Sequence, residues 1–191
     1  MDIVARVKAL LTTPNTEWPV IEAEASSVES IYRNYLVYLA AIPAIVTFIN
    51  KSLIGIYVPI KGIERSGVFT GLVSAVIYYV MTLALIYAVA LVIDALAPNF
   101  GGKKNTLNAF KLSGYSTTAG FIASIFTVVP LIGWIIALAV NIYGIYIFYI
   151  GLPVLMKNPP EKSLLYTVAI CVVYVVVFLV IGLVIGLLAG V

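Results

Sequence analysis

The chain has 191 residues, of which 63% are hydrophobic and only 10% are charged, and its mean hydropathy is +1.14. A water-soluble core cannot hide that much apolar surface, so the composition excludes a soluble globular protein and predicts one that is embedded in lipid. The net charge of +3 is small, and the basic residues lie beside apolar segments rather than in a patch that would bind nucleic acid. The length predicts a single membrane domain over residues 1–191.

Several kinds of chemistry are excluded by residue type. The chain has no histidine and one cysteine, Cys171, which lies in an apolar run with no base beside it. These counts exclude intrachain disulfides, Cys/His zinc sites and histidine acid–base catalysis. We interpret Cys171 as a packing residue. We expect a non-enzymatic protein with no catalytic residue, no cofactor and no metal.

The first 30 residues are predicted to form a cytoplasmic or interfacial segment. Apolar residues recur at helical spacing between Ile3 and Leu11, with charged side chains between them and no continuous apolar run. This pattern predicts an amphipathic helix that lies on the membrane surface and ends at Thr12-Thr13-Pro14. Four glutamates follow, and we interpret them as a solvated face rather than a catalytic pair. They are Glu17, Glu22, Glu24 and Glu29.

The rest of the chain contains five stretches that are long and apolar enough to cross a hydrocarbon layer of about 30 Å. Their approximate ranges are 31–49, 68–96, 107–128, 131–156 and 164–188. The predicted fold is therefore all-α, a polytopic membrane bundle of five transmembrane helices preceded by an N-terminal amphipathic interfacial helix. Only Val129-Pro130 joins the third and fourth stretches, which predicts a tight antiparallel hairpin. The apolar loop 53–60 is too short to span and is expected to lie in the outer interface.

The distribution of lysine and arginine predicts the orientation. Eight of the eleven basic residues lie on the side of the N-terminus and three on the other side. The eight are Arg6, Lys8, Arg33, Lys103, Lys104, Lys111, Lys157 and Lys162, and the three are Lys51, Lys61 and Arg65. Because basic loops stay in the cytoplasm, we expect a multi-pass protein of the cell membrane with its N-terminus cytoplasmic and its C-terminus outside.

Polar side chains of four spans fall near the same depth in the membrane. This candidate midplane layer consists of Tyr78, Tyr79, Thr82, Thr117, Thr118, Asn141 and Tyr174. Asn141 is expected to face inward, because an amide in hydrocarbon needs hydrogen-bond partners. The layer is either a site for a neutral solute or a set of interhelical hydrogen bonds. It holds no ionised residue, which argues against a pathway for charged ions.

Two further groups are candidate sites. Gly182 and Gly186 share one face of the last span, where small residues permit close packing, either within the bundle or in a homodimer. Asp94 lies near the cytoplasmic end of the second span, with Lys103 and Lys104 shortly after it. We interpret this cluster as an ion pair or a cap at the cytoplasmic interface. The third span is rich in serine, threonine and glycine, and is expected at the centre of the bundle.

Three stretches of the chain resemble segments of a known family. They are 14–22 (PNTEWPVIE), 100–107 (FGGKKNTL) and 145–157 (IYIFYIGLPVLMK), the last followed by Pro160, Lys162 and Tyr166. On these residues the chain resembles the Yip family (Ypt-interacting proteins) in its prokaryotic form, over nearly its whole length. The resemblance implies one Yip-like domain of five spans, with a cytoplasmic N-terminus and an exit on the opposite side.

The resemblance carries only part of the family's function. Eukaryotic members bind prenylated Rab-type GTPases and are linked to membrane shaping, but their aspartate-leucine-tyrosine-glycine-proline signature is replaced here by residues 30–35 (SIYRNY). The resemblance therefore does not lead us to expect that this chain binds Rab-type GTPases. We expect an integral membrane protein that organises membrane lipid or partner proteins, the alternative being a small transporter or channel for a neutral or weakly polar solute or lipid. The expected partners are membrane lipids, a second copy of the chain, or an unknown membrane or cytoplasmic protein, and no nucleic acid.

Overall fold

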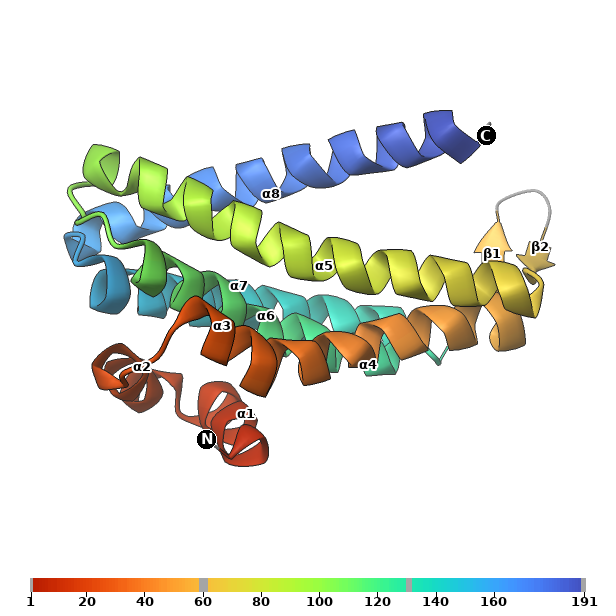
Figure 1. The fold of residues 1–191 in the computed structure, drawn as a ribbon, viewed down its shortest axis with the longest axis horizontal. Coiled ribbons are helices and arrows are strands. Elements are labelled where there is room, and N and C mark those ends of the chain that lie inside the picture. The colour runs from red at the N-terminus through yellow and green to blue at the C-terminus, as the bar shows by residue number, and fades with distance from the viewer. Residues whose placement is uncertain (1, 59–61, 130–131, 190–191) are drawn as a thin grey trace.

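The computed structural model describes residues 2–58, 62–129 and 132–189, with side-chain surroundings for 2–55, 62–129 and 132–176. Long helices lie along one axis, with a pair of short helices beside one end and a β-hairpin at the other (Figure 1). We call the end that holds the short helices the proximal end, and the end that holds the β-hairpin the distal end. The proximal end also contains the connections between α5 and α6 and between α7 and α8.

The elements follow one another in a simple order. Before the bundle come α1 (Ile3–Thr12) and α2 (Pro14–Ala23). The first long helical segment consists of α3 (Val28–Ile31), a π-helical turn (Tyr32–Leu36), α4 (Val37–Phe48) and a second π-helical turn (Ile49–Ile54). The remaining elements are β1 (Ile56–Val58), β2 (Gly62–Glu64), α5 (Val68–Leu96), a 3₁₀ turn (Ala97–Phe100), α6 (Thr106–Phe126), α7 (Ile132–Met156) and α8 (Pro160–Ala189).

The helical fold agrees with the sequence prediction. Helix α5 has the predicted bounds, and the bounds of the other long helices differ from the predicted ones by at most five residues. Within the described part of the chain, three helical segments are long and apolar enough to cross a membrane: Val28–Ile54, Val68–Phe100 and Ile132–Met156. The number of five crossings stays a prediction. The small β-hairpin between the first segment and α5 was not predicted.

This β-hairpin reverses the chain at the distal end. Its strands pair antiparallel, with Ile56 opposite Glu64 and Val58 opposite Gly62. Gly55, which ends the second π-helical turn, has a φ of +97° and leaves no room for a side chain, because a Cβ there would lie 2.4 Å from Ile63 Cγ2. Glycine is therefore required at this position.

Helix α6 occupies the centre of the bundle, as its composition predicted. It contacts α4, α5 and α7, and most of its side chains are buried. Ser113 Oγ donates to the carbonyl oxygen of Ile86 on α5 at 2.8 Å. A Cβ on Gly114 would lie only 3.3 Å from Leu36, so the missing side chain allows close approach.

Helices α6 and α7 form the predicted antiparallel hairpin. Helix α6 ends at Phe126 and α7 begins at Ile132, and the two helices share an extensive interface. Gly133 lies directly over the carbonyl of Phe126, where a Cβ would be 1.8 Å from the oxygen. Gly144 likewise faces Ala119 across the interface. Small residues at both positions therefore let the two helices stay close together.

The N-terminal helices pack on protein. The predicted helix forms as α1, but Leu10 on its apolar side is buried, and α1 and α2 both contact α6 (Figure 1). Trp18 of α2 is fully buried, and its Nε1–H donates to the carbonyl of Ile147 on α7 at 3.0 Å. The bundle therefore covers part of the apolar face of α1, while Val4 is exposed, and the position of α1 at the membrane surface stays a prediction.

The contact between Trp18 and Gly151 gives a test of this docking. A Cβ on Gly151 would lie 2.5 Å from Trp18 Cε2 and 2.8 Å from Leu112 Cδ1, so Gly151→Ala must displace the tryptophan. Such overpacking lowers the free energy of unfolding by about 1–3 kcal/mol. We expect a lower Tm for Gly151→Ala in detergent. Gly67→Ala is the control, since nothing lies within 4 Å of a Cβ there; equal Tm values for both variants would contradict the docking.

Candidate functional site

The threonines of the predicted midplane layer are bound within the bundle. Thr117 Oγ1 donates to the carbonyl of Gly114 at 2.7 Å, one turn back on α6. Thr118 Oγ1 lies 2.6 Å from the carbonyl oxygen of Tyr115 and 2.7 Å from the hydroxyl of Tyr35. Thr82 is half-buried on α5. Hydrogen bonds thus join α6 to the first helical segment at this level.

The tyrosines of the layer do not converge on one point. Tyr79 donates its hydroxyl to the carbonyl of Val37 at 3.0 Å, which ties α5 to α4. Tyr78, the preceding residue on α5, lines a groove on another side of α4. Tyr174 of α8 packs against the hydrophobic core. The structure therefore disperses these side chains among several contacts.

Asn141 differs from the expectation that it faces inward. Asn141 is an exposed residue, and its Nδ2 donates to the carbonyl of Ala137 on the same helix at 2.8 Å. Its Oδ1 lies toward α6, 3.2 Å from where a Cβ of Gly120 would be. The side-chain amide thus has one hydrogen bond to its own helix, at the edge of the interface between α6 and α7. This bond lowers the free-energy cost of placing a polar amide in hydrocarbon.

The cluster around Asp94 is held by a hydroxyl. Thr106 Oγ1 donates to Asp94 Oδ2 at 2.9 Å, which joins α5 to the first residue of α6. Lys103 contributes its backbone N–H, which donates to the carbonyl of Met156 at 2.7 Å, and Lys104 is exposed. In the part of the chain that the structure describes, neither lysine forms an ion pair with Asp94. The ion-pair alternative is therefore wrong.

Buried charges hold the N-terminal helices together. Arg6 of α1 is only 8% exposed and forms ion pairs with Glu17 and Glu24. Its guanidinium also lies over the ring of Tyr115 on α6, 5.6 Å from the centroid. The interpretation of the glutamates as a solvated face is thus wrong for Glu17 and Glu24, whose partner was not recognised. It holds for the exposed Glu29.

Lys111 attaches α2 to the centre of the bundle. Its side chain is 2% exposed, and Nζ donates to the carbonyls of Ile21 at 2.8 Å, Glu24 at 2.7 Å and Glu22 at 3.3 Å. These carbonyls lie at the C-terminal end of α2, where helices leave acceptors unpaired and favour a cation. The sequence contained a signal for this contact, because Lys111 lies inside a predicted span. We used that lysine only in the count of basic residues that predicts the orientation.

The three stretches that carry the family resemblance meet at the proximal end. Trp18, from the first, contacts Gly151 in the third. Phe100, from the second, stacks on Tyr166 with ring centroids 4.5 Å apart. The residues that the resemblance singled out therefore form one connected packing region, which we call the proximal dock.

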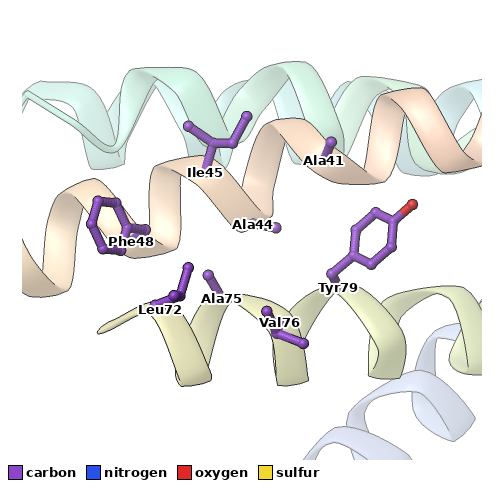
Figure 2. Close-up of a pocket in the computed structure, with 8 residues that line it drawn as sticks. All are labelled: Ala41, Ala44, Ile45, Phe48, Leu72, Ala75, Val76 and Tyr79. Carbon is purple, nitrogen blue, oxygen red and sulfur yellow. The ribbon is translucent and has the colours of Figure 1, made fainter. Parts of the chain in front are cut away.

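A side-open groove lies between α4 and α5, nearer the distal end (Figure 2). Its volume is about 280 Å³, and all eight residues that line it are apolar or aromatic. Three alanines make the space: Ala41 and Ala44 on α4 and Ala75 on α5. Ile45, Phe48, Leu72, Val76 and Tyr79 complete the lining. We call this the α4–α5 groove.

Both ends of the α4–α5 groove are closed by contacts between helices. At one end the Tyr79 hydroxyl bonds to the carbonyl of Val37. At the other end Ser52 lies against Gly71, where a Cβ would be 1.8 Å from Ser52 Oγ. Leu72 and Tyr79 are seven residues apart on α5, which makes the groove about 10 Å long.

A second groove, of about 300 Å³, lies on another side of α4. It is lined by residues of the first helical segment, α5, α6, the turn after α6 and α7, including Pro43, Val46 and Trp134. Its polar lining residues include Asn50 and Lys51 from the second π-helical turn. We call this the Trp134 groove.

Gly182 and Gly186 lie beyond Val176, outside the residues whose surroundings the structure describes, so their packing or dimer face stays a prediction. Within the described residues, no group of three or more His, Cys, Asp or Glu side chains is placed to hold a metal ion. The two grooves are hollows that can accept another molecule, and most of the surface that lines them is apolar.

A bundle of apolar helices with grooves open to the side defines a multi-pass α-helical membrane protein. The chain belongs to the Yip1 domain family, whose model matches residues 8–183, so the predicted resemblance is confirmed. It is similar to inner membrane protein YohC of Escherichia coli (strain K12), with 28% identity over 167 residues that cover 86% of this chain and 85% of the relative. YohC of Escherichia coli O6:H1 is similar to the same extent. No solved structure matches the chain.

The role of Lys111 can be tested by removing its amine. Lys111→Met keeps an apolar stem but leaves three carbonyls without their buried donor, and each such loss costs about 1–3 kcal/mol. Helices α1 and α2 should then detach more often. We expect faster hydrogen exchange over residues 3–23 by mass spectrometry. The exposed Lys104→Met is the control, and exchange rates that match between the two variants would show that Lys111 does not anchor α2.

Proposed function

We propose that this protein is a non-enzymatic membrane protein that organises lipid, by holding an acyl chain in the α4–α5 groove. The observation that carries the proposal is the groove itself, which is open to the side and lined only by apolar and aromatic residues. The acyl chain of a lipid gains dispersion contacts wherever the protein surface has a hollow of matching width. Ala44 on α4 and Ala75 on α5 lie across this hollow from each other, and Ala41 also lines it (Figure 2).

The surface around the groove supports this proposal. Ile45, Leu72 and Val76 line the groove and are each more than half exposed. In water such a surface would be costly, but in a membrane-embedded bundle it meets acyl chains. A lipid that occupies the groove is therefore in contact with walls from two helices, whereas a lipid on a single exposed helix touches one.

The transport alternative has less support. It depended on a midplane layer with polar groups available to a solute. Thr117, Thr118 and Asn141 instead bond to carbonyls of their own helices. Groups that are satisfied in this way have less to offer a passing solute.

Filling the groove tests lipid binding. Ala75→Leu adds bulk between α4 and α5 and should expel the acyl chain, so we expect severalfold fewer retained lipids per protein in native mass spectra recorded from lipid nanodiscs. The matched control is Ala84→Leu, the same substitution at an exposed position of α5 that does not line the groove. Retention by Ala75→Leu equal to that of the control would reject the α4–α5 groove as a lipid site.

We also propose that the proximal end lies in the cytoplasm and the distal end outside, on the basis of the excess of basic residues at the proximal end. Single cysteines at Lys104 and Gly67, placed in a Cys171→Ser background, report the two ends. Both positions are exposed. A membrane-impermeant maleimide should label Gly67→Cys in intact cells and Lys104→Cys only after lysis. The reverse labelling would invert the topology.

A further inference from the structure

The Trp134 groove combines an apolar wall with a cation. Pro43 and Val46 of α4 and the indole of Trp134 on α7 supply apolar surface, while Lys51 supplies the charged group. Trp134 is 64% exposed and lies near the distal start of α7. Tryptophan favours the boundary between headgroups and hydrocarbon, because its ring is apolar and its N–H is polar. The end of the groove that holds Trp134 and Lys51 is therefore expected at the depth of lipid headgroups, and Tyr78 lines the part nearer the predicted midplane.

Among the described residues, no carboxylate neutralises the charge of Lys51. The side chain is half-buried, and Nζ donates to the hydroxyl of Ser74 on α5 at 3.1 Å. No carboxylate lines the groove, and across the described ranges Lys51 forms no ion pair. An ammonium that is partly removed from water and bonded to a neutral hydroxyl still favours an anion beside it.

The position of this ammonium is fixed by its neighbours. Asn50, the preceding residue, donates from Nδ2 to Thr127 Oγ1 at 3.1 Å, which joins the second π-helical turn to the turn after α6. Ser74 holds the lysine from the side of α5. The charge is thus held between two anchored elements at one edge of the groove, rather than on a freely moving surface side chain.

We propose that the Trp134 groove binds one anionic diacyl phospholipid, with its phosphate on Lys51 and an acyl chain along Pro43, Val46 and Trp134. This inference rests on the proposed lipid-holding function and adds a headgroup selection to it. The occupant is a lipid rather than free phosphate, because the apolar wall adjoins the cation and is matched by an acyl chain. Charge complementarity selects an anionic headgroup over a zwitterionic one.

The test uses the full chain in nanodiscs that contain equal amounts of phosphatidylglycerol and phosphatidylcholine. Native mass spectra give the ratio of the two lipids retained by the protein. We expect the wild type to enrich phosphatidylglycerol, and Lys51→Gln to lower that enrichment about fivefold, the effect of losing roughly 1 kcal/mol. Lys51→Arg should keep the enrichment. Lys104→Gln, which removes a charge at the proximal end, is the matched control.

Each outcome decides the proposal. Equal enrichment in the wild type and Lys51→Gln overturns it, as does an equal loss in Lys104→Gln, which would show a general effect of net charge. Displacement of the retained lipid by soluble glycerol phosphate would assign the site to free phosphate and also overturn it. Retention of both lipids without preference rejects headgroup selection but leaves the lipid-holding function, whereas failure to retain either lipid rejects both. Unchanged Tm values of the variants exclude misfolding as the cause.

Discussion

Inside a bilayer, helices are not pressed together by the hydrophobic effect, so this bundle depends on the close packing of α6 against its neighbours. Gly114 admits Leu36, and Gly144 on α7 lies against Ala119. Where the backbones approach this closely, hydroxyls can reach across, as Ser113 does to α5. The first helical segment and α5 enclose the α4–α5 groove, and both are held on this one central helix.

The two ends of the bundle differ in the contacts between their helices. At the proximal end, two buried cations are held by polar partners: Arg6 meets two glutamates, and Lys111 meets three carbonyls. Removing one partner of a buried ion pair is strongly destabilising, because it leaves an uncompensated charge in the interior. Toward the distal end, α4 and α5 instead leave an apolar hollow between them, and the Trp134 groove lies on another side of α4. One end of the protein is therefore closed by specific polar contacts, while the other leaves space for lipid.

The sequence predicted the elements better than their contacts. Helix α5 has the predicted bounds because its apolar run has sharp limits, with Gly67 before it and Pro98 after it. The docking of α1 was missed because an apolar helix face looks the same whether it meets lipid or protein. Arg6, four residues before Leu10 and on the same face, was the available signal that part of this face meets protein. The grooves could not be predicted, because an alanine leaves a hollow only where its neighbours also leave space.

The π-helical turns on both sides of α4 have an evolutionary consequence. A π turn accommodates one residue more than the α-helix it interrupts, so it records a position where a codon can be gained or lost. Such a change rotates α4 by about 100° relative to the flanking segments. It would change which side chains of α4 face α5, for example by bringing Pro43 or Ile45 to the position that Ala44 now occupies. Relatives that differ by a single residue in either turn can therefore be expected to hold different lipids on the same scaffold.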